Sequence, residues 1–405
     1  MLSKKILLER VEKWMSPIYW TDINIRSALF SASVDVQNLA VYEPDDYERP
    51  PILDIIALAD RFQPTRVGTS FGPGWSTKWF HFNVEIPNHT DGQVVCLRWD
   101  SSSEAMIYNS EGMPLQAFTG GNGGDRRDLY ILDAKASPGE RMSYWIEMSC
   151  NEMFGNGDGG MIRPPGPGKT FTLHAAEVVL MNQAAHDLFW DMTVLHDLVQ
   201  VLPDTSPTAD TALALLTRII NSVDLTSEAS IAAAHRVVEP FFASGLSCKT
   251  DHDVWALGHC HIDTAWLWPY AETRRKVARS WVTQCDLLRR YDTYRFVASQ
   301  TVQFEWLAED HPKVMADIES LVRAGKFLPV GGTYVEFDAS LPSGESMVRQ
   351  FLYGMQFMKQ RFNVTPRVFW LPDTFGYSSQ LPQIVRGFGM KFFLSQKLSW
   401  NLLNK

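Results

Sequence analysis

The second half of the sequence, from about residue 253, alternates regularly between short apolar runs and amphipathic helical segments. Five apolar runs have the length of strands: VWALGH, YRFVASQ, FLPVGG, RVFWLPD and KFFLSQ. The segments between them have helical periodicity, and one stripe of the first helix is formed by Val277, Trp281, Cys285 and Leu288. Strict β/α alternation predicts parallel strands joined by crossover helices.

The five predicted strands do not close a β/α barrel by themselves. The sequence stops at Lys405, soon after the fifth strand, and a parallel sheet with a bare edge is open to unwanted pairing. The strands form either an open sheet or the front portion of a longer barrel. We favour the second interpretation, in which the chain is truncated.

The region before residue 182 is rich in strands with a period of two. In TKWFHFNVEI, one face carries Phe80, Phe82, Val84 and Ile86, and the other carries His81, Asn83 and Glu85. This alternation is typical of a half-buried antiparallel strand, and VVCLRW and MSYWIEMS are further strand candidates. The pattern predicts a β-sandwich-like domain over residues 1–182, with an amphipathic helix from Ile6 to Met15.

Helical periodicity returns between these two regions. LALLTRIINSV and ASIAAAHRVVEPFF are the clearest segments, so we expect a helical connector over residues 183–249. The predicted fold is therefore all-β first, then helical, then an α/β part over residues 250–405 that begins a parallel barrel.

Composition excludes some partners and compartments. A formal net charge of -9 argues against nucleic acid or an anionic membrane surface as the main partner. The five cysteines are scattered without a C-x-x-C pair, which favours free thiols in a reducing compartment. The N-terminal apolar run is too short for a signal peptide, and no stretch approaches a membrane span. We expect a cytoplasmic protein, and import elsewhere without a signal peptide stays open.

Polar side chains gather where the predicted strands end, which is where α/β folds place their active sites. The first strand is followed by GHCHIDTAWLW, in which His259, His261 and Asp263 alternate and would share one face if the strand continued that far. The later strands are followed by Ser299 and Gln300, by Glu336 and Asp338, by Asp373, and by Gln396 and Lys397.

An imidazole and two carboxylates around one point suit a divalent cation, with Zn²⁺ the default. His261 and Asp263 would supply two ligands, and Asp373, on the same rim, a third. The alternative is that both histidines are hydrogen-bonded core residues and Asp263 caps a helix. Because Asp373 follows another strand of the same predicted sheet, we favour the metal site.

Aromatic residues lie beside both motifs: Trp266, Trp268, Phe375 and Tyr377. Core packing explains such residues in most proteins, while rings beyond a strand end also suit stacking against the apolar faces of a sugar. The sequence leaves both interpretations open.

Four motifs together resemble one family: HCHIDTAWLWP, GGTYVEFDASLPSGESMVRQFLYG, WLPDTFGYSSQLPQI and SQKLSWN. They resemble the catalytic domain of glycoside hydrolase family 38 α-mannosidases, in the branch of cytosolic and fungal vacuolar class II enzymes. The resemblance covers about residues 250–405, and the β-rich region before it looks like the N-terminal domain of that branch. It implies a seven-stranded barrel, a zinc-type site that also accepts cations such as Co²⁺, and retaining hydrolysis of terminal α-linked mannose in oligosaccharides such as free N-glycans. The compartment implied is the cytoplasm, with delivery to the vacuole open, and a homo-oligomer of the full-length enzyme is compatible with the resemblance.

The resemblance also implies roles for individual residues. His261 and Asp263 match the first two metal ligands, and Asp373 matches the nucleophile, which in this family also binds the metal. Trp266 and Phe375 match aromatic walls of the mannose subsite, where His259 has a supporting place in substrate binding.

The general acid/base of the family and its fourth metal ligand, a histidine, lie beyond the point that corresponds to Lys405. Glu336 or Asp338 would be the substitute acids, but the resemblance gives no reason to choose either. We therefore expect an α-mannosidase whose first 405 residues alone are inactive or nearly so.

Two rival functions remain. A metal-dependent amidohydrolase would need further histidines after later strands, and His311 is the only one downstream of His261. A non-catalytic carbohydrate-binding fragment would use the N-terminal β-domain, and calorimetry with mannose, with and without chelator, would separate it from an enzyme.

Overall fold

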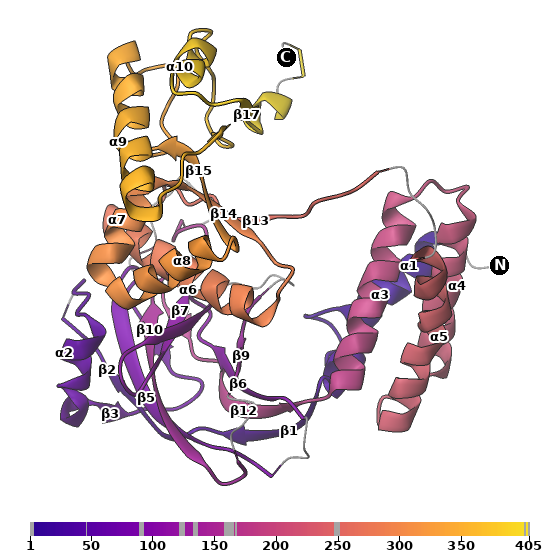
Figure 1. The fold of residues 1–405 in the computed structure, drawn as a ribbon. Helices are drawn as coiled ribbons and strands as arrows, with labels where there is room; N and C mark the ends of the chain where they lie inside the picture. Colours follow the sequence, from indigo (N-terminus) through magenta and orange to yellow (C-terminus); the bar gives the residue numbers. More distant parts are fainter. Residues whose placement is uncertain are drawn as a thin grey trace.

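The computed structural model describes residues 4–45, 47–88, 93–120, 126–132, 137–157, 166, 168–246, 252–400 and 402–403. It contains three parts: a β-domain, a helical bundle beside it, and a β/α part stacked on the β-domain (Figure 1). In the part of the chain described, no helix is both long and apolar enough to cross a membrane. Four of the cysteines are described and all are free thiols: Cys96, Cys150, Cys260 and Cys285.

The β-domain consists of two antiparallel sheets. The first has the order β1 (Phe30–Asp35), β12 (Ala175–Met181), β6 (Val95–Asp100) and β9 (Leu129–Ile131). The second has the order β3 (Gln63–Pro64), β2 (Gln37–Tyr42), β5 (Thr77–Glu85), β10 (Arg141–Ser149), β7 (Ala105–Asn109) and β8 (Pro114–Phe118). Smaller elements complete the domain: β4 (Ser70–Phe71) paired with β11 (Phe171–Thr172), the helix α2 (Ile52–Ile56), and the short turn of helix η2 (Ala59–Arg61).

The space between the two sheets is the first hydrophobic core. The predicted inner face of β5 lies in it: Phe80, Phe82, Val84 and the following Ile86 are all at most 1% exposed. Trp99 of β6 packs against Phe80 and Phe82 from the opposite sheet, with ring centroids 5.0 and 5.7 Å away. The predicted sandwich and its inward face are confirmed.

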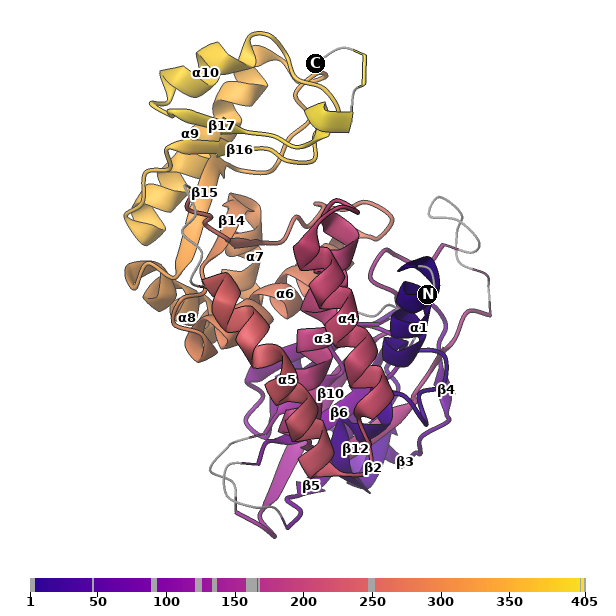
Figure 2. The ribbon, with the colours of Figure 1, turned by 90° about the vertical axis from the view of Figure 1, so that its right-hand side faces the viewer.

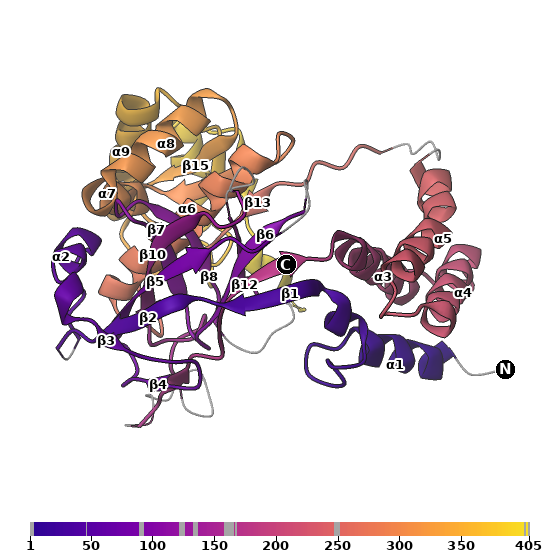
Figure 3. The same cartoon turned by 90° about the horizontal axis from the view of Figure 1, so that it is seen from below.

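The helical bundle consists of α1 (Lys4–Met15), α3 (Gln183–Val201), α4 (Pro207–Ser222) and α5 (Glu228–Leu246), and Figure 3 shows it beside the β-domain. The side chains of Asn182 and Ser206 cap α3 and α4 by accepting backbone N–H groups of the first turns. Val11 of α1 and Ile25 of η1 (Ile25–Ala28) are buried in the same core as the later helices. The helical bundle therefore includes α1 and η1 in addition to the predicted connector. The sequence placed these residues with the β-domain, but α1 buries its apolar side among the helices.

The β/α part contains the five predicted strands in two parallel groups. The first group is β13 (Gly258–His259), β14 (Phe296–Gln300) and β15 (Phe327–Thr333), and the second is β16 (Val368–Trp370) and β17 (Phe392–Leu394). The helices between and after them are α6 (Tyr270–Arg290), α7 (Thr301–Asp310), α8 (Pro312–Arg323), α9 (Gly344–Phe362), α10 (Leu381–Gly387) and the short turn η3 (Lys397–Trp400). Figure 2 shows α9, α10 and the second strand pair at the end farthest from the β-domain.

The first strand is shorter than the sequence predicts. Val254 and Trp255 are 90% and 87% exposed, and only Gly258 and His259 pair, in both cases with β14. The sequence suggested that strand alternation brings His261 and Asp263 together. This is wrong, because the strand ends before His261. An irregular segment after His259 brings them together instead.

The two strand groups curve towards each other. The His259 ring on β13 and the Trp370 ring on β16 have centroids only 5.0 Å apart. The carboxyl ends of β13, β15 and β16 consequently face one common space, although closure into a seven-stranded barrel stays a prediction.

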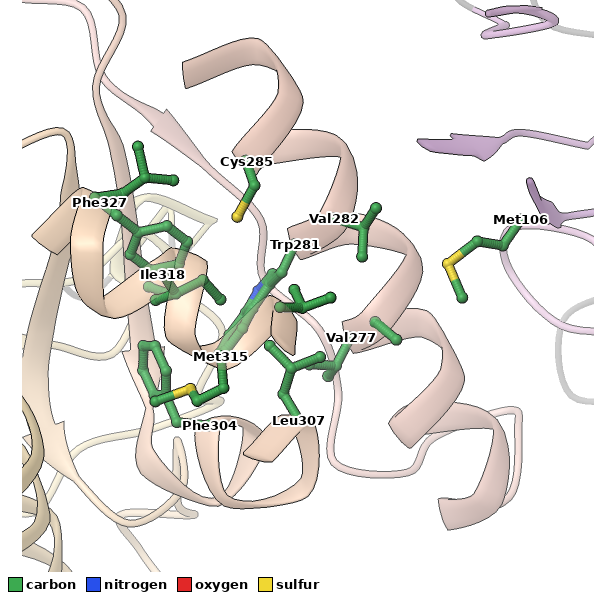
Figure 4. Packing of buried hydrophobic residues seen from close by; sticks show 14 of the residues in the cluster. Met106, Val277, Trp281, Val282, Cys285, Phe304, Leu307, Met315, Ile318 and Phe327 are labelled. Atoms are coloured by element: carbon green, nitrogen blue, oxygen red, sulfur yellow. The ribbon is translucent and has the colours of Figure 1, made fainter. Parts of the chain in front are cut away.

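Helix α6 joins the β/α part to the β-domain. Its predicted stripe is fully buried, and Trp281 packs against Phe304 and Phe327 with centroids 4.4 and 5.7 Å away. Figure 4 shows Val282 on another side of α6, facing Met106 of the β-domain. The outer face of the six-stranded sheet is therefore covered by α6 and shares a second core with the β/α part.

Candidate active site and metal centre

Three of the predicted site residues converge at the carboxyl ends of the strands. The Nε2 atom of His261 lies 3.2 Å from Oδ1 of Asp263 and 3.2 Å from Oδ2 of Asp373. One ligand atom from each of the three residues lies within 4.8 Å of the others, and all three are half-buried. The structure thus joins the loop after β13 to the loop after β16, about 110 residues later in the chain.

The loop that carries Asp263 is held from β14 and α7. The side-chain amides of Gln300 and Gln303 both donate to the Ile262 carbonyl at 2.8 Å, and the Thr264 hydroxyl donates to Oε1 of Gln300 at 3.0 Å. Both glutamines are 2% exposed. Because buried amides with these partners are expensive to displace, the path of the loop is fixed.

Glu336, after β15, lies directly behind His261. Its carboxylate lies 2.5 Å from Nδ1 of His261 and accepts a hydrogen bond from the Ser299 hydroxyl, with the Glu336 side chain 3% exposed. A carboxylate on the far nitrogen of an imidazole is the usual support of a metal-bound histidine, because it orients the ring and fixes the tautomer. With Nδ1 directed at Glu336, Nε2 is directed at the two aspartates.

The electrostatics also suit a cation. Burial lowers the pKa of His261, but hydrogen bonds and charge interactions with Asp263 and Glu336 outweigh burial and raise it to about 10. The site therefore already favours a positive charge at Nε2, and a metal ion would take the place of that proton. One imidazole and two carboxylates form a donor set that fits a borderline divalent ion such as Zn²⁺ or Co²⁺.

Lys397 occupies the other side of Asp373. Its ammonium lies 2.5 Å from Oδ1 of Asp373, and 3.6 and 4.6 Å from the ring centroids of Trp400 and Phe375. Only 13% of the Lys397 side chain is exposed. One oxygen of Asp373 thus faces His261 and the other faces a cation held against two rings.

Large aromatic surfaces stand open beside this group. Phe375, Trp400 and Trp266 are 75%, 64% and 46% exposed, whereas Trp268 is buried beneath Trp266, with the two rings edge to face at 5.3 Å. Of the aromatics whose role the sequence left open, Trp268 is core, Tyr377 donates to the Leu371 carbonyl at 2.6 Å, and Trp266 and Phe375 are exposed.

Two sequence-derived candidates, His259 and Asp338, make their contacts outside the group of three ligands. His259 points to β16, where its Nε2 accepts the indole N–H of Trp370 at 3.2 Å, and burial lowers its pKa. It is not among the three grouped ligands. Asp338 accepts the backbone N–H groups of Ser340 and Leu341 in a turn, which lowers its pKa. The alternative that Asp263 caps a helix over TAWLW is wrong, because residues 264–268 form bends and the next helix, α6, is preceded by Pro269.

Sequence reasoning gave no role to Lys397, Trp400 or Gln300, and considered Glu336 only as an acid. The signal for Lys397 was its position after the fifth strand, but its pairing with Asp373 depends on how the strands curve. His311, the histidine that an amidohydrolase would need, is the residue before α8 and is absent from the ligand group found among the described residues.

Comparison with known proteins agrees with the division of the fold. Residues 34–179 match the alpha-mannosidase jelly roll domain, and residues 251–405 match the glycosyl hydrolases family 38 N-terminal domain. The match covers the β-domain and the part that carries His261, Asp263 and Asp373.

Three relatives illustrate the similarity over most of the chain. Alpha-mannosidase 2C1 of Mus musculus is 41% identical over 400 residues, which is 98% of this chain and 37% of that protein. Alpha-mannosidase G of Dictyostelium discoideum is 36% identical over 99% of this chain and 36% of its own length. Alpha-mannosidase of Saccharomyces cerevisiae is 39% identical over 85% of this chain and 32% of its own length. The chain therefore spans about a third of the length of these relatives.

Proposed function

Because the chain belongs to the glycosyl hydrolase family 38 α-mannosidases, we propose that it supplies the metal-binding and nucleophile-bearing part of a retaining α-mannosidase. The substrate class is oligosaccharides with terminal non-reducing α-D-mannose, such as free N-glycans. The observation that carries the proposal is the position of Asp373, with one carboxylate oxygen facing His261 and Asp263 and the other facing Lys397.

His261, Asp263 and Asp373 would hold the divalent cation, with Zn²⁺ or Co²⁺ as the candidates. When bound, the cation would supply Lewis-acid stabilisation of the sugar hydroxyls, which favours distortion of the mannose ring. Glu336 keeps the His261 ring in position, because it holds Nδ1 from behind.

Asp373 acts as the nucleophile. One of its oxygens forms a bond to the anomeric carbon while the bond to the leaving oxygen breaks, and water later attacks the same carbon and releases mannose with retained configuration. Lys397 fixes the orientation of this carboxylate and partly neutralises its charge before the reaction.

Departure of the leaving oxygen requires a proton donor, which a retaining enzyme places about 5 Å from the nucleophile. Of the described carboxylates that follow β15, Glu336 is engaged by His261 and Ser299, and Asp338 is engaged by its own turn. Neither is free to donate the proton, so this proposal follows the family resemblance in placing the general acid elsewhere, and we expect the 405-residue chain alone to hydrolyse α-mannosides negligibly.

Trp266 and Phe375 form the walls of the mannose subsite in this proposal. Both are exposed beside the carboxylates, and a flat ring can cover the apolar face of a pyranose. His259 would support the site indirectly, because its hydrogen bond with Trp370 joins β13 to β16.

The test uses the full-length enzyme that contains this chain. Asp373→Asn is expected to abolish hydrolysis of p-nitrophenyl α-mannoside without altering the circular dichroism spectrum, whereas His261→Ala should mainly weaken metal binding. Asp338→Asn serves as the matched control and should keep its activity. Unchanged turnover of the Asp373 variant would refute the nucleophile assignment.

Cytoplasmic localisation, delivery to a vacuole and a homo-oligomer of the full-length enzyme stay predictions. A non-catalytic carbohydrate-binding fragment that uses the N-terminal β-domain is the second candidate. Calorimetry with mannose separates the two, since sugar affinity that survives a chelator would contradict the metal-dependent site.

A further inference from the structure

The hydroxyl of Thr273, on the first turn of α6, contacts the loop of Asp263 at three points. It accepts the backbone N–H of Ala265 at 3.0 Å and the indole N–H of Trp268 at 3.0 Å, and it donates to the carbonyl of Asp263 itself at 3.2 Å. A threonine hydroxyl has one proton to donate and two lone pairs. All of its capacity is therefore used by one loop, and Thr273 is 0% exposed.

The loop needs this support because its backbone is strained. Ala265 has a φ of +59°, in the left-handed region that residues other than glycine rarely adopt. Its N–H is one of the groups that Thr273 binds. A conformation of this kind persists only where surrounding contacts over-determine it.

The β-domain holds the same loop through Lys276, one helical turn beyond Thr273. The Lys276 ammonium lies 4.6 Å from the ring centroid of Trp268, and it donates to Glu104 at 2.7 Å and to the Met153 carbonyl at 3.0 Å. Its side chain is 6% exposed. Lys276 therefore connects a residue of the metal-site loop to a carboxylate next to β7 and a carbonyl after β10.

A direct backbone contact reinforces this connection. A Cβ atom placed on Gly155 would lie 2.7 Å from the carbonyl oxygen of Leu267, closer than real Cβ contacts allow. The β-domain thus touches the loop itself as well as the helix beneath it. Only a residue without a side chain fits at that position.

From these contacts we infer that Thr273 is a positioning residue for the metal ligand Asp263, and that Lys276 and Glu104 extend this control to the β-domain. The role of Asp263 as a metal ligand rests on the proposed function. The claim that Thr273 positions the loop does not depend on it. In this inference, contacts from the β-domain contribute to the cation affinity of the site.

The test compares Thr273→Val, which keeps the shape of the side chain, with Thr273→Ser, which keeps the hydroxyl. Hydrogen exchange of residues 263–268 is measured in the metal-free full-length enzyme that contains this chain, and its Co²⁺ dissociation constant is measured by competition with a chromophoric chelator. Thr273→Val is expected to speed exchange in the loop and to weaken Co²⁺ binding by about 10- to 100-fold, as loss of an outer-shell partner does. Thr273→Ser should restore both values to near those of the wild type.

A matched control lies on the same helix. Thr283 is also buried, and its hydroxyl accepts the Ala117 N–H at 3.0 Å and donates to the Arg279 carbonyl at 2.9 Å, away from the loop. Thr283→Val should destabilise the chain without changing loop exchange or Co²⁺ affinity. From the β-domain side, Glu104→Gln should speed loop exchange, while Glu85→Gln, an exposed residue of β5, should not.

The outcomes separate the two claims. Unchanged exchange in Thr273→Val, or unchanged Co²⁺ affinity despite faster exchange, would overturn the inference. Equal effects of Thr273→Val and Thr283→Val would also overturn it, because they would indicate a general loss of stability. A wild-type full-length enzyme that binds no Co²⁺ would overturn the metal centre and the ligand role of Asp263, while the exchange data would still decide whether Thr273 holds the loop.

Discussion

The ammonium of Lys397 lies 2.5 Å from Oδ1 of Asp373, on the side opposite to the contact of Asp373 with His261. The proposed nucleophile is thus held between two cationic groups, one at each oxygen. Two rings, those of Phe375 and Trp400, fix the position of the lysine. This arrangement gives each oxygen of Asp373 a different environment.

Replacing Lys397 should separate catalysis from metal binding. In the full-length enzyme, Lys397→Met is expected to lower kcat on the order of a hundredfold, the usual loss when one preorganised electrostatic partner is removed from an active site. Metal affinity should stay equal or increase, since a positive charge next to the ligand group has been removed. Steady-state kinetics and chelator competition measure the two quantities. Lys391→Met is the control, and a parallel fall in affinity and kcat would contradict the assignment.

Weakening the contact between Glu336 and His261 should lower metal affinity, unlike the replacement of Lys397. Glu336→Gln keeps the size of the side chain but weakens its hold on Nδ1 of His261, so cation affinity is expected to fall by about 10- to 100-fold. Asp338→Asn, on the same loop after β15, should leave affinity unchanged. Competition with a chromophoric chelator measures both. Wild-type affinity in the Glu336 variant would show that Glu336 does not orient a ligand.

Because of the buried ion cluster between α6 and the β-domain, the free energy of unfolding should decrease at acidic pH. Glu272 is 1% exposed and pairs with Arg279 and with Arg275, the latter at 3.1 Å. Burial raises the pKa of Glu272, but the two guanidinium groups outweigh burial and lower it. A carboxyl whose folded pKa is depressed stabilises the fold above its unfolded pKa, near 4.5, and loses this contribution as the pH falls further.

Urea titrations between pH 7 and pH 3 check this expectation. The free energy of unfolding of the wild type should fall steeply below about pH 4.5. Glu272→Gln should be less stable by about 3–5 kcal/mol at pH 7, because Arg279 is left buried without its full partner, and its decline on acidification should be shallower. Glu345→Gln, in an exposed pair with Arg349, should follow the wild type. Identical slopes for Glu272→Gln and the wild type would contradict the linkage.

The second core should be sensitive at its centre. Trp281 is 0% exposed between Phe304 and Phe327, so Trp281→Ala is expected to cost about 3–5 kcal/mol of unfolding free energy. Trp255→Ala, at a residue that is 87% exposed, should leave the unfolding midpoint unchanged. Urea unfolding at neutral pH compares them. A small loss at Trp281 would mean that α6 is not the centre of the shared core.

The features predicted well from the sequence are those encoded locally. The stripe of α6 and the inward face of β5 follow from the spacing of neighbouring residues, and both are buried in the structure. The convergence of His261 and Asp373 was predictable because the carboxyl ends of parallel strands share one edge. Their catalytic and ligand roles stay predictions.

The features that sequence missed depend on contacts between distant segments. Lys397 meets Asp373, and Glu336 meets His261, only because the strands curve by an amount that no local pattern records. The short β13 was missed because an apolar run such as VWALGH predicts burial, whereas Val254 and Trp255 have no such cover in the part of the chain described. The cover of the six-stranded sheet by α6 was also not visible, since both partners have ordinary amphipathic patterns.

The shared second core has a practical consequence. Trp79, Met106, Tyr108 and Trp145 lie on the outer sheet face and are buried in the core that includes α6. If the protein were divided between the β-domain and the β/α part, one fragment would expose this hydrophobic sheet face and the other would expose the side of α6 that packs on it. Both fragments would tend to aggregate. Exchange of either part by gene fusion would therefore require redesign of the residues that form the shared core.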